Sequence, residues 1–393
     1  MSRHLIYLDH ASTSFPKPDA VWHAARDYLT DVGVSPGRGG YRSARAADLL
    51  VEQTRAILAR LLGAADPSRI AFVANATHAL NVAIIGSVSP GDHVVTTNTE
   101  HNSVLRPLEA LARAGIVSYT VIDVTREGVF DLDRFRAAVR PTTRLVVVNH
   151  ASNVTGAVAP VRELSAIARA AGALFLLDAS QTLGLLDVDV DTLGADIVAF
   201  TGHKGLRGPS GTGGLYVREP ARVKPLLRGG TGSSSHVLTH PAAMPAKFEA
   251  GTPNYLGIAG LKAAVELLLA EGIATVRERE LGLFARCLTQ LRGIDGLTLH
   301  EVHPAVPRVP VASINVAHLY PSELSSVLDD EFGIMTRAGI HCAPLIHRSL
   351  GTAPHGTVRV SLGSGTTSTD IEALGEALTR ITARVPLGDY AIA

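Results

Sequence analysis

The chain has 393 residues, of which 46% are hydrophobic and 18% are charged, a composition that supports a large core and predicts a major and a minor domain. Its 36 basic residues balance 36 acidic residues, so no net field attracts nucleic acid or an anionic membrane surface. No segment offers the roughly 18 uninterrupted apolar residues that span a bilayer. We therefore expect a cytoplasmic protein that acts on a small molecule.

The first part of the chain shows no clear hydrophobic period. Residues 5–41 are rich in Gly, Pro and Ser, which favours turns and extended segments over regular elements. We expect residues 1–30 to form an N-terminal segment that packs on the active site, on the small domain or on a neighbouring subunit.

Between residues 70 and 217, short β-rich runs alternate with amphipathic segments. This alternation predicts an α/β fold, with a mainly parallel seven-stranded sheet sandwiched by helices in a large domain of residues 31–255. Ligands bind such sheets at the carboxyl ends of the strands. The expected strands cover residues 70–74, 93–97, 117–121, 144–149, 173–177, 197–200 and 213–217, and the expected helices cover 78–85, 104–114, 132–138 and 161–170.

The remainder, residues 256–393, is expected to form a connecting helix and a smaller C-terminal α+β domain. Residues 256–291 have the apolar period of one or two helices, and strand and helix patterns alternate beyond residue 296. The expected strands include 297–302, 311–316 and 357–362, and the expected helices are 321–330 and 369–385.

A lysine flanked by small residues follows the strand expected to end at residue 200. In Thr201-Gly202-His203-Lys204-Gly205 the glycines let a phosphate-bearing cofactor approach the backbone closely. A desolvated lysine loses its proton readily and attacks aldehydes, whereas arginine stays protonated. None of the other four lysines has this setting. We interpret Lys204 as the Schiff-base lysine of pyridoxal phosphate (PLP), the alternative being an ordinary surface lysine.

Two further strand ends carry residues suited to the same cofactor. Asp178 ends an apolar strand, where it caps a turn or holds a pyridinium nitrogen protonated, and Gln181 follows one turn later. The turn that contains Ala76 and Thr77 opens a helix, and helix N-termini bind phosphate through their free amides. Capping alone also explains that turn.

His101 and Asn153 each follow another expected strand. An imidazole at such a position can stack on a flat heterocycle or exchange protons. In the small domain, Arg337 and Arg359 lie in or beside β-rich segments, and an arginine within an apolar strand needs an anion. We expect a substrate α-carboxylate to bind there, chiefly to Arg359.

The order of these motifs resembles that of class V aminotransferases, and within them the cysteine desulfurase and selenocysteine lyase branch. The resemblance extends from Tyr7 to about Leu378. It rests on Thr-Gly-His-Lys at 201–204, Asp-Ala-Ser-Gln at 178–181, Glu-His-Asn-Ser at 100–103, and the segment 248–254.

The resemblance implies PLP fold type I and a homodimer with shared active sites. It implies that Lys204 carries PLP, that His101 stacks on the ring and that Asp178 pairs with the pyridinium. Asn153 and Gln181 would lie near the 3-oxygen, and Arg359 would hold the substrate carboxylate with Arg337 nearby. The implied phosphate ligands are Thr77, Thr201 and His203, with Thr252 reaching the phosphate in the other subunit.

One departure from the branch concerns the sulfur chemistry. The resemblance implies a nucleophilic cysteine on a mobile loop just before the carboxylate-binding arginine, but Val358 precedes Arg359 and the loop 355–357 has no thiol. Cys342 remains as a candidate catalytic substitute.

With two cysteines in the chain, we expect reduced thiols and no disulfide framework. A metal site at His341, Cys342 and His347 lacks a fourth ligand, and we expect none.

These observations predict a PLP-dependent lyase that cleaves a C–S bond of cysteine or a cysteine conjugate. β-Elimination needs no enzyme thiol and is the working hypothesis. Transamination, epimerisation and decarboxylation coupled to deamination remain alternatives, since all begin with the same substrate adduct. A non-catalytic sulfur carrier or scaffold is a further alternative, against which Lys204, Asp178 and Arg359 argue.

Overall fold

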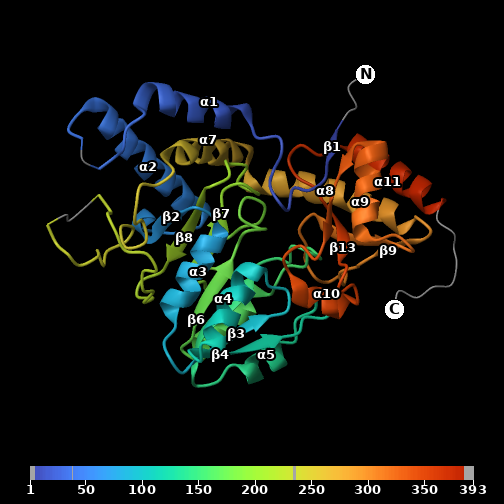
Figure 1. The fold of residues 1–393 in the computed structure, drawn as a ribbon, viewed down its shortest axis with the longest axis horizontal. Helices are drawn as coiled ribbons and strands as arrows, with labels where there is room; N and C mark the ends of the chain where they lie inside the picture. Colours follow the sequence, from blue (N-terminus) through green and yellow to red (C-terminus); the bar gives the residue numbers. More distant parts are fainter. Residues whose placement is uncertain (1–4, 38, 233–235, 385–393) are drawn as a thin grey trace.

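A seven-stranded mixed sheet lies at the centre of the larger part of the molecule (Figure 1). The computed structural model describes residues 5–37, 39–232 and 236–384. The strand order is β2-β8-β7-β6-β5-β3-β4, and only β8 runs antiparallel to its neighbours. All seven predicted strands are confirmed, with ends that differ by at most one residue. They are β2 (Ile70–Val73), β3 (Asp92–Thr97), β4 (Val117–Ile122), β5 (Thr143–Asn149), β6 (Leu174–Asp178), β7 (Ile197–Thr201) and β8 (Gly213–Val217).

Helices cover both faces of this sheet. On β5, Leu145 and Val147 join one buried cluster while Val146 and Val148 join another, because successive side chains of a strand point to opposite faces. The helices α3 and α4 contribute to the first cluster, and α2, α6 and α7 to the second. The bounds are α2 (Arg42–Leu61), α3 (Ala76–Ser87), α4 (Asn102–Arg113), α5 (Leu132–Ala138), α6 (Val161–Ala170) and α7 (Tyr255–Glu271), with a 3-10 turn at Pro67–Arg69.

The N-terminal region is more regular than the sequence indicates. It contains α1 (Asp19–Asp27) and a π-helical turn (Tyr28–Val32), so the expectation of an aperiodic segment over residues 5–41 is wrong there. The helix is short and buries only Val21, whereas Trp22 is exposed, which explains the weak hydrophobic period. Before α1, β1 (Ile6–Tyr7) pairs with β11 (Ile334–Met335), and a turn over residues 10–12 lies between β1 and α1.

A smaller C-terminal α+β unit follows the connecting helices (Figure 1). The apolar stretch 256–291 forms two helices, α7 and α8 (Ile273–Arg292), which break at Gly272 with φ +88°. The second sheet has the order β12-β13-β10-β9 and packs on α8, α9 and α11. Its elements are β9 (Leu297–Leu299), β10 (Val311–Val316), α9 (Pro321–Phe332), β12 (Arg337–Gly339), α10 (Pro344–Leu350), β13 (Thr357–Ser361) and α11 (Ser368–Thr382).

Some predicted boundaries in this unit differ from the structure. The strand expected over 297–302 ends at Leu299, and the helix expected over 369–385 spans Ser368–Thr382. Residue 385 and the rest of the predicted last domain to residue 393 lie outside the described residues. Among the described residues, no helix is both long and apolar enough to traverse a bilayer.

We expect Gly356→Ala to destabilise the small unit much more than Gly351→Ala. Both residues have a left-handed φ, +83° and +71°, so both substitutions cost on the order of 1 kcal/mol of backbone strain. At Gly356, however, a new Cβ would lie 2.1 Å from the carbonyl oxygen of Gly339 on β12, whereas at Gly351 nothing lies within 4 Å. Urea unfolding of both variants would measure this difference. Equal loss of unfolding free energy would contradict it.

Candidate functional site

Lys204 lies in the loop that joins β7 to β8, at the carboxyl end of β7. The amide of Arg207 donates to the carbonyl of Lys204 at 2.8 Å, and the amide of Gly202 donates to the carbonyl of Thr212 at 2.8 Å. These two backbone hydrogen bonds fix the conformation of the loop. Burial, assisted by the guanidinium of Arg359, lowers the pKa of Lys204 to about 8. Within the described part of the chain its amine makes no hydrogen bond. The structure thus supplies a readily deprotonated amine at a sheet edge.

A cavity of about 220 Å³ opens beside this amine. It brings together most of the residues that the sequence singled out, from the ends of five strands of the large sheet and from β12 and β13 of the small sheet. The predicted site residues that line it are Ala76, Thr77, His101, Asn153, Asp178, Gln181, Thr201, His203, Lys204, Arg337 and Arg359.

The N-terminus of α3 forms one wall of this cavity. Asn75 caps the helix by accepting a hydrogen bond from the amide of His78 at 2.9 Å, which leaves the first amides, those of Ala76 and Thr77, without helical acceptors. The hydroxyl of Thr77 lies 2.7 Å from that of Ser103. Free amides, a hydroxyl and the helix dipole are the groups that bind a phosphate.

Asp178 ends β6, where its side chain is 6% exposed. Its Oδ1 accepts hydrogen bonds from the amide and the hydroxyl of Ser180. Within the described residues no donor contacts the other carboxylate oxygen. An oxygen that lacks a donor, on a carboxylate that lines the cavity, suits a pyridinium N–H, as PLP would provide.

His101 caps α4, and its contacts fix both the tautomer and the charge of its ring. Nδ1 accepts a hydrogen bond from the amide of Ser103 at 3.1 Å, which places the proton of the neutral ring on Nε2. Burial lowers the pKa of His101 to about 4. The ring is therefore neutral near pH 7, which suits stacking on a flat heterocycle.

Glu100, which the sequence argument did not select as a site residue, is completely buried next to His101. Its Oε1 accepts from the hydroxyl of Thr97 at 2.7 Å and from the amide of Asn149 at 3.1 Å, while Oε2 has no partner. Burial raises the pKa of Glu100 to about 8. A neutral carboxylic acid thus supports the strand ends under the site. A charged residue three positions after a buried strand was the available signal.

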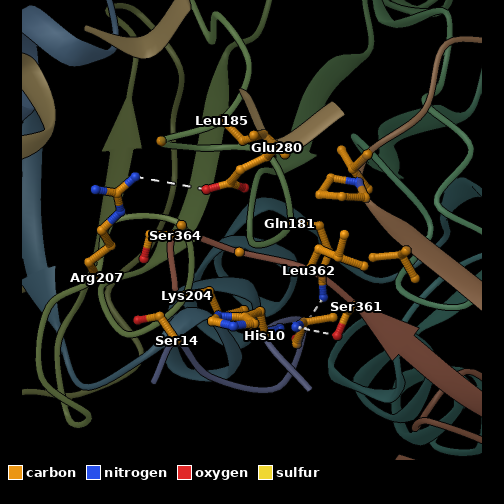
Figure 2. A pocket seen from close by; sticks show the side chains of 17 residues that line it. His10, Ser14, Gln181, Leu185, Lys204, Arg207, Glu280, Ser361, Leu362 and Ser364 are labelled. Carbon is orange, nitrogen blue, oxygen red and sulfur yellow. Dashed lines mark hydrogen bonds and ion pairs between the residues drawn. The ribbon is translucent and has the colours of Figure 1, made fainter. Parts of the chain in front are cut away.

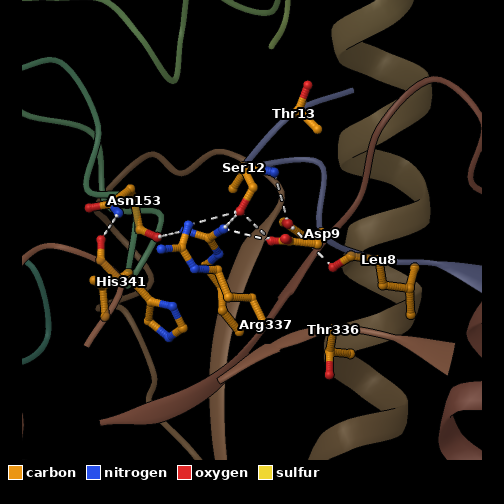
Figure 3. A network of polar contacts seen from close by, with 12 residues as sticks. Leu8, Asp9, Ser12, Thr13, Asn153, Thr336, Arg337 and His341 are labelled. Atoms are coloured by element: carbon orange, nitrogen blue, oxygen red, sulfur yellow. Dashed lines mark hydrogen bonds and ion pairs between the residues drawn. The ribbon is translucent and has the colours of Figure 1, made fainter. Parts of the chain in front are cut away.

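The two predicted substrate arginines face each other across neighbouring strands, since Arg337 on β12 pairs in register with Arg359 on β13. Arg359 is 1% exposed. Its Nη2 donates to Asp9 Oδ1 and to Ser12 Oγ, both at 2.7 Å, and its Nη1 donates to the carbonyl of Asn153 at 3.1 Å. Arg337 Nη1 donates to Ser12 Oγ at 3.0 Å (Figure 3). Sequence reasoning missed Asp9 and Ser12.

The environment of the two thiols differs sharply. Cys287 packs in the core of the small unit, and burial raises its pKa to about 12. Cys342 is half-buried, and its Sγ lies 3.7 Å from Arg337 Nη2. Cys342 does not line the cavity beside Lys204, although Arg337 does. Of the two thiols, only Cys342 contacts a residue of the site.

The loop that the sequence argument placed at 355–357 ends at residue 356, because Thr357 already belongs to β13. Val358 also belongs to β13 and is buried in the core of the small unit. At Val358 the strand pairs with both β10 and β12, so this position is held within a sheet. Thr252, predicted to reach the other subunit, lines separate hollows away from Lys204. Among the described residues, no group of three or more His, Cys, Asp or Glu is placed to hold a metal.

A second, smaller cavity of about 50 Å³ also reaches Lys204 (Figure 2). Arg207, whose φ is +60°, extends from the Lys204 loop to the α7–α8 junction, where it donates to Glu271 at 2.7 Å and lies 3.8 Å from Glu280. Arg279 contacts both glutamates and closes a ring of two cations and two anions. Burial raises the pKa of Glu280 to about 7. The ring ties the lysine loop to the connecting helices.

Comparisons with known proteins agree with this architecture. Residues 6–374 match the family described as Aminotransferase class-V. The chain is 35% identical over 385 residues to a probable cysteine desulfurase of Methanothermobacter thermautotrophicus, covering 96% of this chain and 94% of that protein. It is 36% identical to probable cysteine desulfurase 2 of Mycobacterium leprae, with coverages of 94% and 90%.

Solved structures of cysteine desulfurases are also similar to this chain over nearly its whole length. The apo cysteine desulfurase of Thermococcus onnurineus NA1 superposes with a TM-score of 0.89 at 32% identity, covering 97% of this chain and 95% of that one. An Escherichia coli cysteine desulfurase gives a TM-score of 0.87 at 27% identity, with coverages of 97% and 96%. The predicted PLP fold type I is thereby confirmed. The chain belongs to the class V aminotransferase family and is a PLP-dependent enzyme.

Proposed function

We propose that the protein cleaves the C–S bond of L-cysteine or of a cysteine conjugate. The observation that carries this proposal is the thiol of Cys342, 3.7 Å from an arginine that lines the cavity of Lys204. This position beside the expected carboxylate site supports Cys342 as a sulfur nucleophile. The names of the relatives, which are cysteine desulfurases, support the same chemistry.

The residues of the cavity fit PLP. The amides of Ala76 and Thr77, with Thr201 and His203, would hold its phosphate, and the free oxygen of Asp178 would hold its pyridinium nitrogen. His101 would stack on the ring, and Asn153 and Gln181 would lie near the 3-oxygen. When bound to Lys204, PLP supplies an electron sink for negative charge at the substrate Cα. The enzyme is proposed to act in the cytoplasm as a homodimer, with Thr252 reaching the phosphate in the partner subunit.

Different side chains of the protein would then orient the substrate, transfer the proton and accept the sulfur. Arg359 and Arg337 would orient the substrate carboxylate, and the amine of Lys204, with its pKa near 8, would remove the α-proton. The sulfur of Cys342, beside Arg337, would attack the substrate sulfur. A bond would form between the two sulfurs, the C–S bond would break, and its electron pair would stay on the substrate Cβ, which would take up a proton; return of the α-proton from Lys204 to Cα would then give alanine.

A second candidate reaction is β-elimination, which requires no enzyme thiol. One observation favours it: Cys342 does not line the cavity in which the substrate would react. Elimination would release sulfide or a thiol and leave aminoacrylate, which hydrolyses to pyruvate and ammonia. The two candidates use the same Lys204 and Arg359 and differ in their carbon product.

PLP capture by the apoprotein should respond to pH around 8. The neutral amine reacts with the aldehyde, so the capture rate should rise with pH and be half-maximal near 8, well below the ordinary lysine value of about 10.5. In Arg359→Gln the midpoint should move upward, because a positive charge that disfavours the ammonium is removed. Stopped-flow absorbance would follow the reaction. A midpoint near 10 in the native protein, or capture by Lys204→Ala, would contradict the assignment.

Cys342→Ala should reduce alanine formation from L-cysteine by at least about 100-fold, because the sulfur acceptor is lost. The control is Cys287→Ala, which removes the thiol buried in the small-unit core and should keep alanine formation near the native level. Mass spectrometry would measure alanine, pyruvate and persulfide on the protein. Undiminished pyruvate release by Cys342→Ala would favour β-elimination and oppose a role for this thiol.

A further inference from the structure

The proposed carboxylate site contains its own counter-ion. Asp9 Oδ1 accepts a hydrogen bond from Arg359 Nη2 at 2.7 Å and another from Ser12 Oγ at 2.8 Å. Arg359, Arg337 and Ser12 line the cavity beside Lys204, but Asp9 does not. The carboxylate of Asp9 therefore contacts Arg359 without lining the cavity; Asp9 and Ser12 are seen together in Figure 3.

This arrangement fixes the charge that a ligand meets. Two guanidinium groups face the cavity, and one carboxylate in contact with Arg359 compensates one of them, so the cluster presents a single net positive charge. Among the described residues that line the cavity, the one carboxylate is that of Asp178, which belongs to β6 of the large sheet and is proposed to pair with the pyridinium. A single net charge matches one α-carboxylate. A ligand with two carboxylates would leave one without a matching cation.

We infer that Asp9 is a positioning residue that acts through Arg359 and makes the site select substrates with one carboxylate over those with two. The inference rests on the proposed binding of a substrate carboxylate by Arg359, but it does not depend on C–S cleavage. It extends the proposed function by assigning charge selectivity to a residue of the N-terminal segment.

The substitution Asp9→Asn separates charge from shape. The asparagine oxygen can accept both hydrogen bonds that Asp9 Oδ1 accepts, so the geometry around Arg359 can persist while the negative charge is lost. Arg337→Gln changes the net charge in the opposite direction, and Arg337 is only half-buried. Ser12→Ala is a matched control, because it removes a neutral partner of the same Arg359 nitrogen.

The test is titration calorimetry of the PLP-loaded enzyme with butyrate and succinate, which have four carbons each and one or two carboxylates. The quantity measured is the ratio of succinate affinity to butyrate affinity. Asp9→Asn should raise this ratio about tenfold, since the added net charge attracts a dianion more than a monoanion. Arg337→Gln should lower it, Ser12→Ala should leave it within about twofold of native, and Asp9→Asn/Arg337→Gln should restore it.

Several outcomes would overturn the inference. A ratio unchanged in Asp9→Asn would do so, and so would a raised ratio that Arg337→Gln does not reverse, because a merely structural role is not rescued by removing a cation. If Asp9→Asn fails to fold because Arg359 loses its buried partner, an unchanged ratio in Arg337→Gln alone decides against it. Absence of butyrate binding to the native enzyme would refute carboxylate binding by Arg359 itself, independently of any assay of C–S cleavage.

Discussion

The buried guanidinium of Arg359 is the interaction on which the assembly of the site depends. A charge removed from water is tolerated only when it is paired and hydrogen-bonded. The partners of Arg359 come from distant parts of the chain: Asp9 and Ser12 from the N-terminal segment, and the carbonyl of Asn153 from the loop after β5. The small sheet, the large sheet and the N-terminal segment must therefore all be in place before the two Nη atoms of the arginine have these partners.

The same N-terminal segment also fixes the loop of the lysine. The carbonyl of His203, directly before Lys204, accepts hydrogen bonds from the amide of Ser14 at 2.9 Å, the hydroxyl of Thr13 at 3.0 Å and the amine of Lys17 at 2.8 Å. On the far side of the loop, Arg207 is held by the ion ring at the α7–α8 junction. The loop is thus restrained from two directions, which keeps the desolvated amine in one place although no other described residue forms a hydrogen bond with it.

Much of the large sheet could be predicted because its strands are short, apolar and bounded by turn residues. The residues that follow parallel strands converge at one edge by topology, so Lys204, Asp178, His101 and Asn153 could be grouped from the sequence alone. Asp9 and Ser12 could not, because their role arises from a contact with Arg359 across about 350 residues of chain, which no local pattern records. The helix α1 was missed because it buries only one side chain.

The position of Cys342 was also beyond local patterns, and it bears on the sulfur chemistry. His341 and Cys342 both adopt left-handed backbone conformations, with φ of 49° and 58°, which cost energy in residues with side chains. One hydrogen bond stabilises each of the two strained residues. Asn153 Nδ2 donates to the carbonyl of His341 at 2.7 Å, and the amide of Asn102 donates to the carbonyl of Cys342 at 2.6 Å.

These bonds attach the strained turn to the loops that carry Asn153 and His101, two residues of the cavity wall. The thiol is therefore fixed relative to the site even though it lies outside the cavity lining. A turn that served only to connect β12 to α10 would not need two consecutive strained residues anchored to two loops of the other sheet. This anchoring supports a role for the turn in placing the thiol of Cys342 beside Arg337.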